Sequence, residues 1–256
     1  MRKLFGLLVV GLMIVVVAGC GATDTLAEVE ERGYIEFAMS GGYPPFNYYN
    51  DAGELVGFDV EIAAEVAERL GVESRPVTND FDGLVGGLQA GNFDGILGSM
   101  AITPERLEAV DFSDPYYYSG AQLVVATDSS IEDVSDITED MRIGVVTGTT
   151  FADQVNEWGA EAVYYDSDAL TLQELNVGNV DGVITDRLVA LINADERGFD
   201  IRMVGDYLYL EECAVAVRQG DDDLREAINQ ALEDMRADGT YQEISERYFG
   251  EDIGVK

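Results

Sequence analysis

The chain has 256 residues, 47% of them hydrophobic, and sets 15 lysine and arginine residues against 50 aspartate and glutamate residues, with no histidine. This length and apolar content predict one large or two small α/β units, with a core that needs no disulfide. The formal charge of −35 argues against nucleic acid or an anionic membrane surface as a partner. Without histidine or a CxxC motif, we expect no zinc site, no histidine-dependent catalytic triad and no cofactor.

The acidic residues recur in clusters along the chain, such as EVEERG, EVAERL, IEDVSDITED and GDDDLREAI. Apolar residues at folding periods separate the acids, so each cluster is predicted to be a solvated face of a folded element. An acidic, lysine-poor surface resembles the acidic proteome of a halophile, in which such surfaces keep proteins hydrated. A merely acidic protein is the alternative.

The first twenty residues have the pattern of an export signal. A basic start (Met1–Lys3) precedes an apolar run at 4–17, which is shorter than the ~20 residues that a membrane-spanning helix needs. We therefore predict a signal peptide at 1–19. The closing Val-Ala-Gly-Cys resembles a lipobox, which makes Cys20 the lipid-bearing first residue of a lipoprotein on the outer face of the cytoplasmic membrane. An uncleaved anchor is the alternative, and residues 20–32 are predicted to be a lipid-anchored tether.

Strands and helices alternate along the rest of the chain. Strands are predicted at 34–39, 72–77, 93–100, 122–126, 142–146, 163–165, 180–185, 201–204 and 214–217. Helices are predicted at 59–70, 82–90, from 104, and at 151–158, 170–177, 187–194, 224–236 and 241–248. This alternation predicts α/β layers with largely parallel sheets. Cys213 lies in an apolar alternating run and is predicted to be a buried thiol.

Arg106 stands where one of these helices begins. Thr103 suits the N-cap and Pro104 the first helical position. A cation at the positive end of a helix is mildly unfavourable, so we expect an anion nearby. Free backbone N–H groups and a guanidinium can share one carboxylate. The alternative is an arginine folded back onto neighbouring acids such as Glu108.

Two more segments lead from a strand into a helix. Residues 144–150 (GVVTGTT) offer glycine, threonine hydroxyls and backbone amides. Residues 181–187 (DGVITDR) place Asp186 at the junction, where an N-cap is its ordinary role. Alone, each pattern is a weak indication of a ligand site.

Four motifs in order resemble the family 3 solute-binding proteins of ABC transporters, which bind polar amino acids. They are YPPFNYYNDAGELVGFDVEIAAEVAERLG (43–71), FDGLVGGLQAGNFDGILGSMAITPER (81–106), VDFSDPYYYSGAQLVV (110–125), and GVVTGTT with GNVDGVITD (144–150 and 178–186). The resemblance extends from about Gly33 to Gly250. It implies the α/β, two-lobed periplasmic-binding-protein fold of type II, in which two hinge strands join the lobes and the ligand lies between them. Lobe 1 would comprise 33–121 and 210–250, and lobe 2 would comprise 122–209.

The resemblance also implies roles for residues of this sequence. Arg106 would clamp the α-carboxylate of an amino acid, the Thr150 backbone amide would contact the same group, and Asp186 would receive the α-ammonium. Tyr43 and Phe81 would be aromatic walls. Each of these residues could instead have a purely structural role, in the core or as a helix cap. The implied ligand-binding set is Ser40, Tyr43, Phe81, Gly98, Ser99, Ala101, Arg106, Thr149, Thr150 and Asp186.

Two departures from the family pattern bear on the ligand. Ala101 stands where members often have Ser or Thr, so one hydroxyl contact is missing, which water or Ser99 would replace. Ser40-Gly41-Gly42 stands where binders of basic amino acids commonly carry an acid. Burying an unpaired cation is costly, so a neutral polar side chain such as that of glutamine is favoured.

The expected function is capture of an L-amino acid by lobe closure and its delivery to the permease and ATPase subunits of an ABC importer. The protein would be a monomer and not an enzyme. Two alternatives remain open: a cyclohexadienyl dehydratase-like enzyme on the same fold, and a ligand-sensing domain that acts through a partner.

Overall fold

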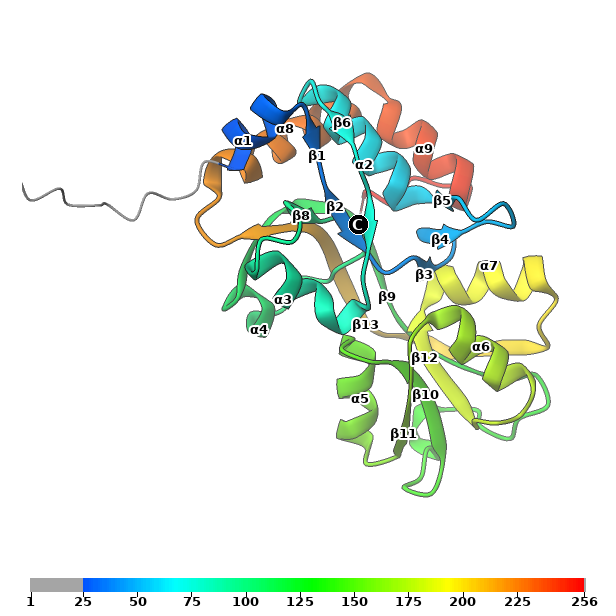
Figure 1. Ribbon diagram of the computed structural model, residues 1–256. Helices are drawn as coiled ribbons and strands as arrows, with labels where there is room; N and C mark the ends of the chain where they lie inside the picture. The colour runs from blue at the N-terminus through cyan, green and yellow to red at the C-terminus, as the bar shows by residue number, and fades with distance from the viewer. Residues whose placement is uncertain (1–24, 256) are drawn as a thin grey trace, which may run out of the picture.

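The computed structural model describes residues 25–255, without the side chains at 194–197. The predicted signal peptide and Cys20 lie outside the described residues. Figure 1 shows two lobes: the upper one contains the N-terminal and C-terminal thirds of the chain, and the lower one contains the middle third. Two long strands, β9 (Val110–Ala126) and β13 (Ile201–Arg218), run from one lobe into the other.

One eight-stranded sheet passes through both lobes in the order β11-β10-β12-β9-β13-β8-β2-β7. β9 and β13 pair antiparallel from Ala126↔Ile201 to Val110↔Arg218, and the pairing is interrupted between Val204 and Tyr209. The predicted division at 121/122 and 209/210 falls inside these two strands. The lobes are therefore joined by paired strands and not by a loose linker.

Lobe 1 holds short strands covered by helices. Its strands are β1 (Tyr34–Ile35), β2 (Phe37–Met39), β3 (Gly42–Tyr43), β4 (Asn47–Tyr49), β5 (Leu55–Val56), β6 (Glu73–Ser74), β7 (Val77–Thr78) and β8 (Gly95–Ile96). Its helices are α1 (Thr25–Arg32), α2 (Phe58–Arg69), η1 (Phe81–Gly83), α3 (Leu84–Gln89), α4 (Pro104–Leu107), α8 (Asp222–Asp238) and α9 (Thr240–Phe249). Apolar residues one helical turn apart in α2, such as Phe58, Ile62 and Val66, are all buried.

Lobe 2 is an α/β layer built on parallel strands. Its elements are η2 (Val134–Asp136), β10 (Arg142–Val146), α5 (Thr150–Trp158), β11 (Glu161–Tyr165), α6 (Asp168–Asn176), β12 (Gly182–Asp186) and α7 (Arg187–Arg197). β10 pairs parallel with both β11 and β12, and β12 pairs antiparallel with β9. Because parallel strands point the same way, the helices that follow β10, β11 and β12 begin at one edge of the sheet, beside lobe 1 (Figure 1).

The predicted alternation of strands and helices is confirmed, and the differences lie at the lobe junction and in lobe 1. The strands predicted at 201–204 and 214–217 are parts of the single strand β13, and β9 begins at Val110, before its predicted start. The strand predicted at 93–100 shortens to β8, since the chain turns away at Ser99, whose φ is 58°. Cys213 is a buried free thiol, as predicted.

Part of the predicted tether is instead a helix. Residues 25–32 form α1, and the side chain of Val29 is fully buried in the lobe 1 core. Thr25 Oγ1 donates to Asp221 Oδ2 at 2.7 Å, and Arg32 forms an ion pair with Asp94. TLAEVEER has few apolar residues among its acids, and these form only a narrow apolar face on the helix. The sequence pattern therefore indicated a tether.

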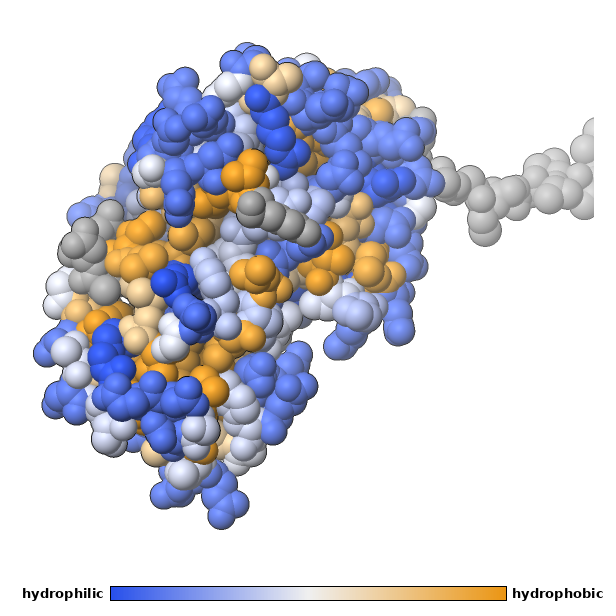
Figure 2. All heavy atoms as spheres, turned by 180° about the vertical axis from the view of Figure 1, so that it is seen from behind, coloured by the Kyte–Doolittle hydropathy of each residue, from blue (hydrophilic) through white to orange (hydrophobic). Residues whose placement is uncertain are grey.

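The cations of the described chain are all arginines, because lysine stands only at positions 3 and 256. Many of these arginines form ion pairs, such as Arg69 with Asp238 at 2.8 Å. Figure 2 shows a rear face that is hydrophilic over both ends of the molecule, with apolar side chains gathered between them. No helix within residues 25–255 is both long enough and apolar enough to cross a membrane.

Candidate functional site

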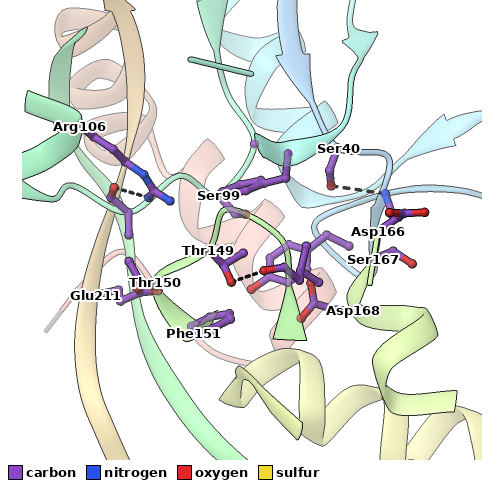
Figure 3. Close-up of a pocket in the computed structure, with 16 residues that line it drawn as sticks. Ser40, Ser99, Arg106, Thr149, Thr150, Phe151, Asp166, Ser167, Asp168 and Glu211 are labelled. Atoms are coloured by element: carbon purple, nitrogen blue, oxygen red, sulfur yellow. Dashed lines mark hydrogen bonds between the residues drawn. The ribbon is translucent and has the colours of Figure 1, made fainter. Parts of the chain in front are cut away.

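A pocket of about 490 Å³, counted to its open mouth, lies between the lobes. Every residue of the predicted ligand-binding set lines it except Asp186. The lining residues are Ser40, Gly42, Tyr43, Phe81, Gly98, Ser99, Ala101, Arg106, Val146, Thr149, Thr150, Phe151, Asp166, Ser167, Asp168 and Glu211. In Figure 3, Arg106, Thr150 and Glu211 lie toward one end, and Asp166, Ser167 and Asp168 lie toward the other. The ends therefore differ in charge.

Arg106 enters the pocket from the first turn of α4. Thr103 Oγ1 accepts from the Arg106 backbone N–H at 3.2 Å, as expected for an N-cap. The guanidinium donates to Ala101 O at 2.7 Å and to Gly148 O of lobe 2 at 3.2 Å. It also lies 5.5 Å from the centroid of the Phe81 ring. Arg106 thus touches both lobes.

No carboxylate within residues 25–255 forms an ion pair with Arg106. The arginine is therefore not folded back onto the acids of its own helix. Burial lowers the pKa of the guanidinium, an effect that the nearby Glu211 opposes. A partly desolvated cation that donates to carbonyl oxygens can accept an anionic ligand without first breaking an ion pair.

The N-terminus of α5 faces this cation. Thr149 is the N-cap residue, but its side chain does not cap the helix, because Thr149 Oγ1 donates to Val146 O at 2.7 Å. Thr150 Oγ1 donates to Glu211 Oε1 at 2.5 Å. The first amides of α5 thus have no side-chain acceptor, and such amides favour an anion.

Three lining acids are absent from the predicted set. Asp168 begins α6, is only 5% exposed, and accepts from Thr185 Oγ1 at 2.6 Å. Burial raises its pKa to about 7. Asp166 is exposed at the pocket, and burial raises the pKa of Glu211 on β13. Asp166 directly follows strand β11 and Asp168 opens helix α6, and acids at such a strand-to-helix junction are a signal that could have found them.

Asp186 lies behind the lining. It is 1% exposed, and its Oδ1 accepts from Ser119 Oγ at 2.9 Å and from the Leu188 N–H at 2.7 Å. It therefore makes the N-cap contact that is its ordinary role. Burial raises its pKa to about 7. Burial raises the pKa of Tyr43, and the charges of Asp186 and Asp168 add to this effect. The binding of an ammonium by Asp186 stays a prediction.

The lobe 1 wall presents hydroxyls whose protons already have acceptors. Ser40 Oγ donates to Asn47 Oδ1 at 3.0 Å, and Ser99 Oγ donates to Asp59 Oδ2 at 2.9 Å. Each oxygen keeps lone pairs for a ligand donor. Ala101 contributes its carbonyl to Arg106, and its side chain is 4% exposed.

Comparison with known proteins gives the family. Residues 35–251 match the model of the bacterial extracellular solute-binding proteins, family 3. The chain belongs to this family. It is 35% identical to the L-cystine-binding protein TcyJ of Escherichia coli (strain K12) over 232 residues, which cover 89% of this chain and 87% of that protein. It is 33% identical to the histidine-binding periplasmic protein of Escherichia coli (strain K12) over 254 residues, which cover 93% of this chain and 95% of that protein.

Solved structures of similar proteins have the same two-lobed fold. The P235GK mutant of ArgBP from T. maritima has a TM-score of 0.84 and 34% identity, covering 89% of this chain and all of that one. An ancestral arginine-binding protein bound to glutamine has a TM-score of 0.81 and 38% identity, covering 86% and 99%. The predicted fold class and family resemblance are confirmed.

In this family 3 protein the lobes touch on both sides of the pocket. A Cβ on Gly42 of lobe 1 would lie 2.7 Å from Ser167 Cβ of lobe 2. A Cβ on Gly148 of lobe 2 would lie 2.8 Å from Asp82 Cβ of lobe 1. Real Cβ atoms do not approach so closely, so only glycine fits at these two contacts. The lobes are therefore closed over the pocket.

Proposed function

We propose that this protein captures an L-amino acid outside the cytoplasm, closes its lobes over it, and delivers it to the permease of an ABC importer. One observation carries the proposal: the guanidinium of Arg106, which has no ion-pair partner within residues 25–255, lines the same pocket as the N-terminus of α5. The α-carboxylate would bind Arg106 in bidentate fashion and accept from the amides of Thr150 and Phe151.

The α-ammonium would bind at the acidic end. Asp168 and Tyr43 line the pocket, and Asp186 lies behind the lining. Both acids are buried among neutral hydrogen-bond donors, so a cationic group would relieve an unfavourable desolvation. Ser99 Oγ and the Gly98 carbonyl would complete the ammonium site. Because each of these two charged groups would be contacted from both lobes, an α-amino acid would hold the lobes together.

The identity of the side chain is the finer part of the proposal. The sequence favours a neutral polar side chain such as that of glutamine, because no acid stands at residues 40–42. The pocket adds Asp166, which is exposed at its rim, so a cationic side chain would find a partner on the lobe 2 wall. The choice between glutamine and arginine therefore depends on whether Asp166 forms an ion pair with the side chain of the ligand.

Isothermal titration of the mature chain tests the proposal. Residues 21–256, refolded to remove bound ligand, are titrated with the twenty amino acids and cystine in low and in molar KCl. We expect heat from one or a few L-amino acids, and no heat from their D-enantiomers or from analogues that lack the α-carboxylate. A folded protein that is silent across the panel would contradict amino-acid capture.

The transport partners and the monomeric state rest on the family resemblance, and the lipid at Cys20 rests on the resemblance of Val-Ala-Gly-Cys to a lipobox. Supporting tests are uptake of the bound amino acid by cells with and without the gene, mass spectrometry of the N-terminal peptide, and light scattering. A protein that binds an amino acid but does not affect uptake would favour the sensing alternative.

The enzyme alternative rests on buried acids that can carry a proton near neutral pH. Burial raises the pKa of Asp168 and of Asp186 to about 7. An elimination reaction needs such an acid beside the leaving group. Incubation with prephenate and chromatography of the products tests it: release of an aromatic acid would support the enzyme and oppose simple capture.

A further inference from the structure

A buried carboxylate links the two segments of lobe 1 that line the pocket, one at Ser40–Tyr43 and the other at Gly98–Ala101. We call these segments the two lobe 1 walls. Asp59, in the first turn of α2, is fully buried and does not line the pocket. Its Oδ1 accepts from the Tyr116 hydroxyl at 2.7 Å, and its Oδ2 accepts from Asn47 Nδ2 at 2.7 Å and from Ser99 Oγ at 2.9 Å. None of the arginines with described side chains forms an ion pair with it.

The first wall is reached through Asn47, which is also fully buried. An ionised carboxylate can only accept hydrogen bonds, so Asn47 must turn its amide nitrogen toward Asp59. Its Oδ1 then faces the other way, where it accepts from Ser40 Oγ at 3.0 Å and from the Gly41 N–H at 2.8 Å. Asp59 thereby fixes the strand end that presents Ser40 and Gly42 to the pocket.

The second wall is Ser99, whose φ of 58° is uncommon for a residue other than glycine. The Tyr116 hydroxyl donates to Asp59, so its oxygen is free to accept from the Ser99 N–H at 2.9 Å. The Ser99 hydroxyl also donates to Asp59. Asp59 thus determines the proton position on two hydroxyls and secures the turn that places Gly98 and Ser99 at the pocket.

We propose that Asp59 is a positioning residue for ligand binding. Its negative charge sets the direction of each hydrogen bond in this network and holds both lobe 1 walls in their binding arrangement, without touching the ligand. This inference rests on the proposed function, because it assumes that the pocket is the ligand site.

The same geometry predicts a dependence on pH. Burial raises the pKa of Asp59 to about 6, against the three hydrogen bonds that lower it. The other titratable groups facing it are Tyr116 on β9, Cys213 on β13 and Tyr241 on α9, and burial raises the pKa of each. These three therefore stay neutral at acidic and neutral pH. Protonation below about pH 6 would give Asp59 a proton to donate, so the Tyr116 or Ser99 hydroxyl would have to turn its own proton away from Asp59 to accept it.

The variant Asp59→Asn tests the proposal, because it keeps the size of the side chain and removes the charge. The matched control is Asp94→Asn, which changes a lobe 1 acid that is also buried. Asp94 accepts from Arg32 and from the Glu36 N–H and does not line the pocket. The mature chain is titrated at pH 8 with L-arginine and with L-glutamine.

We expect Asp59→Asn to raise the Kd about tenfold or more, since a buried donor is left without its charged acceptor. We expect Asp94→Asn to lower the melting temperature and leave the Kd unchanged. The double variant Asn47→Asp/Asp59→Asn returns a carboxylate to the network and should recover part of the affinity. Equal affinities for the wild type, Asp59→Asn and Asp94→Asn would overturn the proposal.

A second measurement needs no ligand. Amide hydrogen exchange, followed by NMR, should show faster exchange at Gly41 and Ser99 in Asp59→Asn, and unchanged exchange at both amides in Asp94→Asn. If Asp59→Asn does not fold, Tyr116→Phe keeps the carboxylate and should expose Ser99 alone. Protection of both amides in a folded Asp59→Asn would overturn the positioning role. If the wild type binds no amino acid, the proposed function fails, and the exchange result still decides the role of Asp59.

Discussion

The two lobes contribute to one pocket in different ways. Lobe 1 offers side chains that buried hydrogen bonds hold in place, such as Arg106 on the Ala101 carbonyl and Ser99 on Asp59. Lobe 2 offers the starts of three helices, at Thr150, Asp168 and Asp186–Arg187. The wall in lobe 1 is set by packing within that lobe, whereas the groups in lobe 2 meet the ligand only when the lobes come together. The difference predicts that lobe 1 offers a largely preformed surface, to which the lobe 2 groups are added on closure.

The largest expected effect is at the lobe 1 cation. Arg106→Ala should cost about 2–5 kcal/mol of binding free energy, because it leaves the ligand carboxylate buried without its charged partner. Arg106→Lys should recover only part of this, since lysine cannot donate in bidentate fashion. Isothermal titration measures both variants. Arg236→Ala is the control: Arg236 also forms no ion pair among the described side chains, donates to Pro115 O, and lies outside the pocket. Equal losses in the two alanine variants would contradict the clamp.

The lobe 2 acids should come next. Asp168→Asn and Asp186→Asn each remove a negative charge near the ammonium and should cost about 1.5–3 kcal/mol of binding free energy. Asparagine is as good an N-cap as aspartate, so Asp186→Asn should keep α7 intact. Titration and thermal melting separate the two effects. Unchanged affinity in Asp186→Asn would limit that residue to capping, and unchanged affinity in both variants would remove the ammonium site from lobe 2.

Closure itself can be weakened without touching a charge. Gly42→Ala places a Cβ 2.7 Å from Ser167 Cβ, so the lobes must stay slightly apart and the affinity should fall about tenfold, by the population of the closed state. Small-angle scattering should show less compaction on adding ligand. Gly86→Ala is the control, because a Cβ there meets nothing within 4 Å. Full compaction in Gly42→Ala would show that this contact does not limit closure.

The smallest expected effect is the response to pH. Burial raises the pKa of Asp168 and Asp186 above that of an unfolded aspartate, so both favour the folded state at low pH, and that stability is lost as pH rises from about 4 to about 7. Binding has the opposite sign, since an ammonium needs the ionised acids, and affinity should fall severalfold below pH 7. Melting and titration from pH 4.5 to 8 in molar KCl would measure both slopes. The variant Asp168→Asn/Asp186→Asn should reduce the change of melting temperature and of affinity with pH. A pH dependence equal to that of the wild type would assign it to other acids.

The site residues that could be predicted are those whose roles depend on neighbours close to them in the sequence. Thr103, Pro104 and Arg106 lie in one short motif whose capping chemistry is local, so their placement follows from spacing. Asp168 follows a strand and opens a helix, as the GVVTGTT and DGVITDR segments do, but its burial depends on Thr185 from another strand. Glu211 could not be predicted, because its place in the pocket depends on where β13 crosses between the lobes.

The fold could be predicted where apolar residues repeat over several helical turns, and the prediction failed where the elements are short. Helices such as α5 and α8 carry several turns of apolar spacing and were found close to their observed ends. Strands β3, β4 and β5 hold only two or three residues each and show no readable alternation. Helix α1 was missed because a single buried valine, Val29, marks its inner face.

The interrupted pairing of the two long strands sets how the molecule can move. At the lobe junction β13 runs from Val204 to Tyr209 while β9 runs only from Leu123 to Ala121, so the extra residues at this crossing are in β13. A change of angle between the lobes would lengthen or shorten the path of β13 and leave β9 as a fixed pivot. The largest change of angle between the lobes is then limited by the number of extra residues that β13 has at this crossing.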